Sequence, residues 1–248
     1  MQTVRLRRLR EKDNIRQWAS ETQLLAKNII LPYFVVEGEG VKEPISSMPG
    51  IYHLSIDNLL KDISGAVGIK SVLLFGLGTE KDGLGSEAYN HNGVIQRAVK
   101  AIKKEFSDIV VLSDICLCGY TSHGHCGIVR EGRIDNDATL DVLAKVTLSH
   151  ADAGADFVSP SAMMDGQVRA IRGSLDREGF KDTGIMGYSV KYASGFYGPF
   201  REALESTPQF GDRKSYQMDY RNANEALREI AQDIAEGADI VMVKPALS

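Results

Sequence analysis

All three cysteines of the chain lie in one short stretch, "DICLCGYTSHGHC", at residues 114–126. Glycines and two histidines separate Cys126 from Cys116 and Cys118, so a turn can bring the third sulfur back to the first two. Three thiolates can hold a zinc ion at roughly 2.3 Å each and leave its fourth position free for catalysis. The spacing therefore indicates a zinc site.

Two alternatives stay open at this point. His123 or His125 would close the site as a structural Cys₃His centre if either ring filled the fourth position. Otherwise the three thiols would be ordinary buried side chains. An odd number of clustered cysteines does not suit a disulfide framework, so we expect a reducing, cytoplasmic setting.

Two lysines end segments that are otherwise apolar: Lys191 in "GYSVKYASGFYGPF" and Lys244 in "VMVKP". A single lysine at the end of a strand usually extends to water. If both side chains entered one pocket, burial and mutual repulsion would favour the neutral amine. Because a neutral amine can attack a ketone and form a Schiff base, the pair suggests carbonyl chemistry.

A long irregular segment follows Lys191, at residues 193–217. Its glycines and aromatic residues are interleaved with Arg201, Arg213 and Lys214. This pattern is typical of a mobile lid whose cations bind substrate carboxylates. A charged surface loop would show the same composition, so the segment does not decide the function alone.

Composition excludes some classes of partner. The chain has 248 residues and a formal charge of −4, which gives no reason to expect binding to nucleic acid. No apolar run approaches the roughly 18 residues that a membrane-spanning helix needs. The N-terminus is rich in arginine, but no apolar stretch follows it, so it is not a secretory signal.

The elements that must position these residues alternate between strand-like and helix-like segments. Continuous apolar runs predict parallel strands that are buried on both faces, and amphipathic segments at 94–106, 138–154 and 222–237 predict helices between them. The six predicted strands cover residues 28–36, 71–77, 108–117, 155–162, 184–193 and 239–245. Alternation along the third strand would place Asp114, Cys116 and Cys118 on one face at its carboxyl end, where parallel α/β folds build active sites.

Taken together, the chain resembles the zinc-dependent branch of the 5-aminolevulinate dehydratase (porphobilinogen synthase) family. The motifs "RLRRLR", "LPYFVVEG", "DICLCGYTSHGHCG", "PSAMMDG", "KYASGFYGPFREA", "FGDRKSYQ" and "GADIVMVKPA" carry the resemblance over essentially the whole chain. It implies a lyase that condenses two 5-aminolevulinate molecules to porphobilinogen with loss of two waters, a step of haem and other tetrapyrrole biosynthesis.

The resemblance also implies a role for each matching residue. Lys191 and Lys244 would form Schiff bases with the two substrates, and the three cysteines would hold a catalytic zinc. Glu229, on the helix before the last strand, would bind an allosteric magnesium. The positions that match substrate-binding residues are Arg201, Arg213, Gln217, Asp114, Ser161, Tyr197 and Phe200. Ala162 stands where many members carry aspartate, and we expect it to tune the surroundings of the pocket.

The fold implied by the resemblance is a TIM (β/α)₈-type barrel at residues 27–248, preceded by an N-terminal arm at residues 1–26. A closed barrel needs eight strands and only six are predicted. We therefore expect a barrel truncated after the sixth strand, which lacks a serine and a tyrosine that bind the second substrate carboxylate and has little activity alone. Arm-exchanged dimers that assemble into a homo-octamer are a further implication.

Other functions compete with this interpretation. A class I aldolase-like Schiff-base lyase would use Lys191 or Lys244 but needs no metal, so it would leave the cysteines unexplained. A non-catalytic fragment or paralogue would bind zinc without forming imines. A purely structural zinc module would explain neither the lysines nor the aromatic lid.

Overall fold

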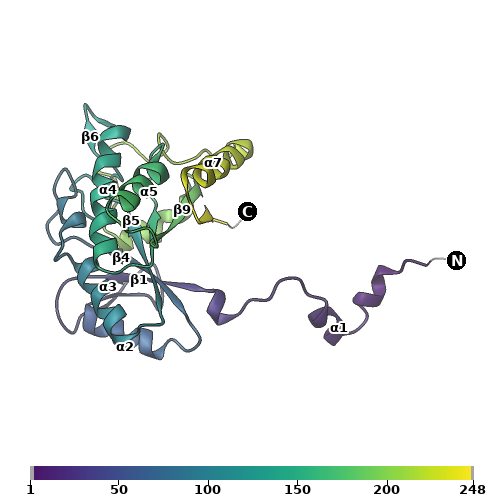
Figure 1. Ribbon diagram of the computed structural model, residues 1–248. Helices are drawn as coiled ribbons and strands as arrows, with labels where there is room; N and C mark the ends of the chain where they lie inside the picture. The colour runs from purple at the N-terminus through teal and green to yellow at the C-terminus, as the bar shows by residue number, and fades with distance from the viewer. Residues whose placement is uncertain (1–2, 247–248) are drawn as a thin grey trace.

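Six parallel strands form the centre of the fold, and they lie side by side in the order in which they occur along the chain. The structure is a computed structural model that describes residues 3–246 (Figure 1). The six strands are β1 (Ile30–Val35), β4 (Ser71–Gly76), β5 (Val110–Ile115), β8 (Phe157–Pro160), β9 (Gly184–Lys191) and β10 (Ile240–Lys244). Each of these strands lies within the segment predicted for it. Strands that are covered on both faces are continuously apolar, and the sequence therefore shows where they lie.

Two short strands extend the sheet beyond β1 and were not predicted. They are β2 (Lys42–Pro44), which is antiparallel to its neighbour, and β3 (Tyr52–Leu54), which is parallel to β1. The complete order is β10-β9-β8-β5-β4-β1-β3-β2, with β10 and β2 at the two edges. Among residues 3–246 the sheet is therefore open, and the α/β fold with a mostly parallel sheet is confirmed without a closed barrel. Truncation itself stays a prediction.

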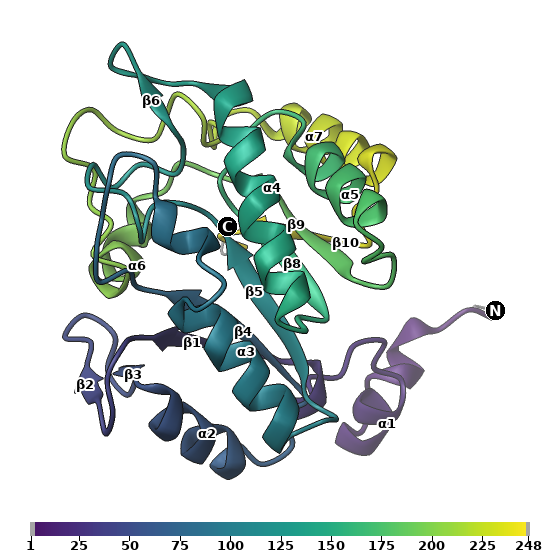
Figure 2. The same cartoon turned by 60° about the vertical axis from the view of Figure 1, so that its left-hand side comes forward.

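The helices follow the strands along one face of the sheet (Figure 2). They are α2 (Ile56–Gly65), α3 (Val94–Glu105), α4 (Asn136–Asp152), α5 (Gln167–Arg177) and α7 (Ala223–Glu236). The three helices that the sequence predicted are α3, α4 and α7, and Gly237 ends α7 with a φ of 104°, as a helix-terminating glycine should. Helices on one face leave the opposite face of the sheet free to build a site.

Strand alternation separates the core into two layers. Tyr33 and Val35 of β1 pack with Val72 and Leu74 of β4 against the helices. Phe34, which lies between the first two, points to the opposite side of the sheet and packs with Leu73 and Phe75. Because alternate residues face opposite sides, each strand supplies both the helix interface and the inner surface.

The remaining elements are short. A hairpin follows the cysteine-rich stretch, and a small helix lies inside the segment that the sequence marked as an irregular lid. These elements are β6 (Val129–Arg130), β7 (Arg133–Ile134), α6 (Gly198–Ala203) and the 3₁₀ turns Leu6–Leu9, Ala26–Asn28, Ser86–Tyr89 and Gly195–Tyr197. No helix in the described range 3–246 is both long and apolar enough to cross a membrane.

The N-terminal segment extends away from the rest of the protein (Figure 1). It contains one short helix, α1 (Asp13–Trp18), and its side chains from residue 3 to residue 28 are exposed apart from the partly covered Ile15. Trp18 and Leu24 are 83% and 82% exposed. These large apolar side chains therefore have no cover within the described part of the single chain.

One buried histidine makes the fold sensitive to acid. His150 on α4 is 1% exposed, and its Nδ1 lies 2.9 Å from the hydroxyl of Ser113 on β5. Burial lowers the pKa of His150 from 6.5 to about 3. Because the unfolded chain then takes up the proton first, stability that is complete above pH 6.5 falls as the pH drops toward 3.

We predict that His150→Asn removes this part of the acid sensitivity, since the asparagine oxygen can accept the hydrogen bond but does not titrate. Between about pH 7.5 and about pH 4.5, the free energy of unfolding should fall by roughly 3 kcal/mol more in the original protein than in the variant. Urea denaturation at the two pH values measures the difference. Equal losses in both proteins would contradict the assignment.

Candidate active site

The three cysteines converge below the lid. Cys116, Cys118 and Cys126 are buried, and their sulfurs all lie within 4.8 Å of one another. The Sγ atoms of Cys116 and Cys118 are 3.5 Å apart. Sulfurs bound tetrahedrally to one zinc ion at roughly 2.3 Å lie roughly 3.8 Å from each other, so the donor set fits this metal.

A turn, and not strand alternation, brings Cys116 and Cys118 together. β5 ends at Ile115, one residue before the first cysteine, which corrects the prediction that both cysteines belong to the strand. The chain then folds back on itself, and the carbonyl of Leu117 accepts hydrogen bonds from the amides of Tyr120 and Thr121 at 2.8 and 2.9 Å. The predicted strand at residues 108–117 therefore extends two residues too far at its carboxyl end and two at its amino end.

Neither neighbouring histidine belongs to the sulfur cluster. Among the described residues, the cysteines form the only group of three or more potential metal ligands within 4.8 Å. Both ring nitrogens of His125 are engaged elsewhere, at 3.0 Å from the hydroxyl of Tyr216 and at 2.9 Å from the carbonyl of Phe210. The geometry does not support a closed Cys₃His centre.

The electrostatics of the cluster favour one thiolate. Hydrogen bonds from the thiols of Cys116 and Cys118 lower the pKa of Cys126 well below its usual value, and the guanidinium of Arg213 adds to this effect. The hydrogen bond to Cys118 raises the pKa of Cys116. An anionic sulfur held between two thiols is suited to a cation, because metal ligands must be deprotonated.

The two lysines lie side by side. Lys191 ends β9 and Lys244 ends β10, and the two residues are direct partners in the parallel pairing of these strands. Their Nζ atoms lie 5.5 and 5.4 Å from the centre of the same ring, that of Tyr188. The structure therefore brings together the two amines that the sequence singled out.

An irregularity in β9 turns Lys191 toward its partner. Val241 pairs with Gly187 and Val243 pairs with Val190, so β9 advances three residues where β10 advances two. Regular alternation would place Tyr188 and Lys191 on opposite faces of the strand. The extra residue, which forms a β-bulge, puts the amine and the ring on one side.

The two lysine side chains have different surroundings. Lys191 is 5% exposed, and its Nζ donates a hydrogen bond of 2.6 Å to the carbonyl of Ser161. Lys244 is surrounded by aromatic rings, the nearest of which is Phe200 with its centre 4.1 Å from Nζ. Burial and the neighbouring Lys191 lower the pKa of Lys244 to about 8. A substantial fraction of this amine is therefore neutral near physiological pH.

Asp114 places a carboxyl group near the two amines. It lies on β5, and burial raises its pKa to about 6, although the nearby amine of Lys191 opposes the rise. A carboxyl group with this pKa can give or take a proton near neutral pH. Ser161, from the segment after β8, is buried beside it and holds Lys191 through its carbonyl.

The first part of the lid closes over Lys244. The hydroxyl of Tyr197 donates a hydrogen bond of 2.9 Å to the carbonyl of Lys244. Phe200, on α6, packs edge-to-face on Phe75 at 5.0 Å between ring centres. Both residues were predicted to line the pocket, and the structure places them against the second amine.

Several predicted substrate-binding residues are buried with unsatisfied polar atoms. In the described part of the chain, nine buried side-chain atoms lack a hydrogen-bond partner, and five of these belong to Asp114, Arg201, Arg213 and Gln217. Buried polar groups are normally paired, so this concentration indicates groups arranged for a ligand. In Gln217 both the amide oxygen and the amide nitrogen lack a partner.

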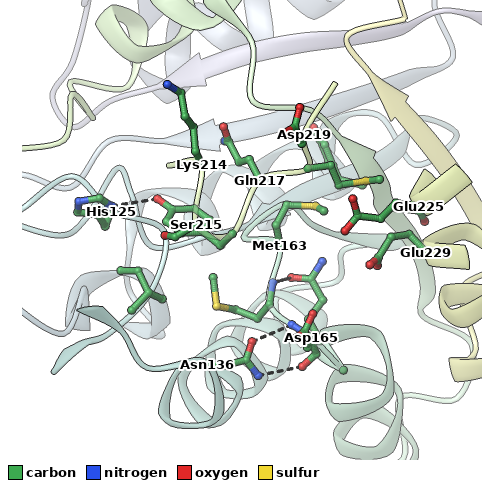
Figure 3. A pocket seen from close by; sticks show the side chains of 18 of the residues that line it. His125, Asn136, Met163, Asp165, Lys214, Ser215, Gln217, Asp219, Glu225 and Glu229 are labelled. Atoms are coloured by element: carbon green, nitrogen blue, oxygen red, sulfur yellow. Dashed lines mark hydrogen bonds between the residues drawn. The ribbon is translucent and has the colours of Figure 1, made fainter. Parts of the chain in front are cut away.

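Glu229 lies apart from the amines, in a cavity of about 1050 Å³ (Figure 3). Glu225 and Asp165 line the same cavity, as does the lid from Asp212 to Asp219. Burial and the neighbouring acidic side chains raise the pKa of Glu229. The two lysines do not line this cavity, whereas Tyr188, whose ring lies near both amines, does.

Two residues of the site were not predicted from the sequence. Tyr188 was assigned no role, although its ring faces both amines. Phe75 stands at the end of β4, with its ring centre 6.0 Å from the Nζ of Lys244. Its position at the carboxyl end of a parallel strand was a usable signal, because such positions line the active sites of barrels.

Amines buried at the carboxyl ends of adjacent parallel strands, beside a carboxyl group and three convergent thiols, define an α/β enzyme built for carbonyl chemistry. The sequence model of the family described as "Delta-aminolevulinic acid dehydratase" matches residues 3–248. The chain belongs to the delta-aminolevulinic acid dehydratase family. Membership of this family makes the protein a lyase.

Individual relatives agree with this result. The chain is 55% identical over 246 residues to the delta-aminolevulinic acid dehydratase of Methanothermus sociabilis, which covers 98% of the chain and 77% of that protein. It is 52% identical over 246 residues to the enzyme of Bacillus subtilis, covering 98% of the chain and 76% of that protein. The chain thus spans about three quarters of the length of these relatives.

A solved structure shows the same arrangement of the backbone. The delta-aminolevulinic acid dehydratase (porphobilinogen synthase) of Toxoplasma gondii, in complex with the reaction product porphobilinogen, superimposes with a TM-score of 0.94 at 46% sequence identity. The match covers 99% of this chain and 72% of that chain. The open sheet seen here therefore follows the backbone of an enzyme of this family.

We predict that the reactivity of Lys244 rises with pH around a midpoint near 8, because only the neutral amine is nucleophilic. In Lys191→Met the midpoint should move upward, since removal of a neighbouring positive charge makes protonation of Lys244 easier. The rate of acylation at this residue, followed by peptide mass spectrometry across a pH series, measures both midpoints. A midpoint near the ordinary lysine value of 10.5 in both proteins would contradict this prediction.

Proposed function

We propose that this protein condenses two molecules of 5-aminolevulinate to porphobilinogen with loss of two waters, as a step of tetrapyrrole biosynthesis. The observation that carries this proposal is the direct pairing of Lys191 with Lys244 at the ends of β9 and β10. Two ketone substrates need two amines within reach of each other, and strand pairing fixes that separation. The family and its relatives support this reaction over the others considered.

Each amine would form an imine with the ketone of one substrate and release one water, and both lysines would leave as free amines when the new C–C and C–N bonds of the product form. Burial favours this step, because it lowers the pKa of Lys244 and makes the amine nucleophilic. An imine also acidifies the neighbouring carbon, so that one substrate can supply a carbon nucleophile and the other an electrophile. Asp114, with a pKa of about 6, is suited to move the protons.

The lid would bind a substrate carboxylate and fix its orientation. Arg201, Arg213 and Gln217 have buried polar atoms without partners, and a carboxylate would satisfy them. Tyr197 and Phe200 would cover the Lys244 side of the site and exclude water. Ser161 would hold Lys191 in position through its carbonyl.

We propose zinc as the cofactor, held by Cys116, Cys118 and Cys126. The convergence of three sulfurs within 4.8 Å supports this assignment, and so does the low pKa of Cys126. When bound, zinc would supply a Lewis acid beside the substrates. The buried, free thiols also support a reducing, cytoplasmic location.

We also propose a magnesium ion at Glu229. The acidic residues around the cavity in Figure 3 support it, because Mg²⁺ prefers oxygen ligands. The described residues offer no group of three carboxylates within 4.8 Å there. An ion at this position would therefore keep most of its water ligands, as Mg²⁺ commonly does.

We further propose that the protein forms homo-oligomers through its N-terminal arm, with an octamer as the assembly. Large apolar side chains of the arm, such as Trp18 and Leu24, are exposed in the single chain. The arm is also rich in arginine, whereas the cavity next to α7 is lined by acidic residues. These opposite charges favour contact between copies.

We predict that borohydride reduction in the presence of 5-aminolevulinate adds substrate mass to Lys191 and Lys244. Lys244→Met should lose the adduct at that position, and kcat should fall by roughly 10⁴-fold, because a covalent step is removed. Peptide mass spectrometry locates the adduct. As a matched control, Lys100→Met changes an exposed lysine on α3 and should retain both adducts and activity. If borohydride reduction added substrate mass only to lysines other than Lys191 and Lys244, the result would contradict the proposed function.

A second prediction concerns the metal. Cys118→Ser should reduce zinc affinity by at least roughly 100-fold, since the hydroxyl is a poor ligand in a site that needs three thiolates. Equilibrium dialysis with metal analysis measures the change. Ser122→Ala, in the exposed part of the same loop, should bind zinc like the original protein. Undiminished zinc affinity in Cys118→Ser would exclude the cysteine cluster as the zinc site.

A further inference from the structure

The loop that carries the third cysteine forms hydrogen bonds with the lid at several successive residues. We call residues 122–126 the cysteine loop and residues 206–217 the lid segment. The amide of Gln209 donates to the carbonyl of His123 at 3.0 Å, and Arg213 donates to the carbonyl of Gly124 at 2.8 Å. Two segments that are about 90 residues apart in the chain thus form one packed unit.

His125 makes the central contacts of this unit. It is 2% exposed, and the carbonyl of Phe210 accepts from its Nε2 at 2.9 Å, so the proton lies on this nitrogen. The other nitrogen, Nδ1, then accepts from the hydroxyl of Tyr216 at 3.0 Å. The ring also packs on Phe210 with 4.5 Å between ring centres. Both ring nitrogens therefore hold the lid segment.

The backbone leaves no space between the two segments. A Cβ atom on Gly124 would lie 2.5 Å from the carbonyl oxygen of Thr207, and the φ of Gly124 is +70°. Glycine is required here both for its conformation and for the close approach. Because the segments touch directly, a shift of the cysteine loop must displace the lid segment.

We infer that His125 is a positioning residue that couples the occupancy of the cysteine cluster to the ordering of the lid segment. His125 is adjacent to Cys126, so a cation that fixes this sulfur also fixes the ring. The ring in turn holds the lid segment, which carries Arg213 and Gln217. This inference rests on the proposed function, in which these two residues bind a substrate carboxylate.

Coupling of this kind is reciprocal. If zinc favours the ordered lid, then substrate that orders the lid must strengthen zinc binding by the same factor. Coupling between two sites in proteins typically amounts to factors of roughly 5 to 150. Loss of the two hydrogen bonds of His125 should therefore change the coupling by roughly tenfold.

Hydrogen exchange of the full chain, with zinc chloride or with a chelator, tests the inference. In the original protein, zinc should slow exchange in both the cysteine loop and the lid segment. In His125→Phe, which keeps a ring but neither hydrogen bond, zinc should still protect the cysteine loop. The protection that zinc gives to the lid segment should fall roughly tenfold. Tyr216→Phe, which removes the bond to His125 together with the contact of the hydroxyl with Cys126, should also reduce this protection.

A matched control exists on the other side of the lid. The Nε2 of His53 on β3 lies 2.6 Å from the carbonyl of Ala203, the last residue of α6. This hydrogen bond does not involve the cysteine loop. His53→Gln should loosen α6 but leave the effect of zinc on the lid segment unchanged. With zinc at saturation, KM should rise roughly tenfold in His125→Phe while kcat changes less.

Three results would overturn the inference. Full zinc-dependent protection of the lid segment in both His125→Phe and Tyr216→Phe would show that the ring does not carry the coupling. Zinc that binds to the original protein without any change in the lid segment would refute the coupling and leave the zinc site standing. Failure of zinc to bind at all would refute both the proposed cofactor and the coupling.

Discussion

The site depends on two amines that share one desolvated space at the ends of β9 and β10. Backbone pairing places Lys191 opposite Lys244, and the bulge in β9 turns the first amine toward the second. Burial of Lys244, together with the neighbouring charge of Lys191, disfavours the protonated form of Lys244. The pKa of Lys244 falls to about 8 as a result. This constraint is the physical basis of the imine chemistry that we propose for the two lysines.

The other parts of the site are arranged around that pair. Asp114 stands on β5 and gains a raised pKa from the same burial that lowers the pKa of Lys244. The aromatic rings of Tyr188 and Phe200 exclude water on two sides of Lys244. The lid closes the site and is held to the cysteine loop by direct hydrogen bonds. The cysteine cluster, the lid and the amines therefore form one connected structure.

Sequence patterns located the strands and most of the site, because both leave local signatures. A continuous apolar run predicted β9 with Lys191 at its end. The close spacing of the three cysteines predicted that their sulfurs come together. The sequence patterns gave wrong results where the limits or the existence of a strand depend on contacts with distant parts of the chain. They extended β5 through Cys116, although a turn that is stabilised by packing ends the strand at Ile115. They also missed β2 and β3, which consist of three residues each and gain their order from strand pairing, β3 with β1 and β2 with β3.

The sequence by itself determined the fold class, the family resemblance and the types of group that do the chemistry. It could not determine that the rings of His125 and Tyr188 occupy central positions, because neither type nor spacing distinguishes them from other buried rings. The tertiary structure decided these points. Strand register, a bulge and the contact between two distant loops depend on pairings across the chain, and a linear pattern of residues records only neighbours along it.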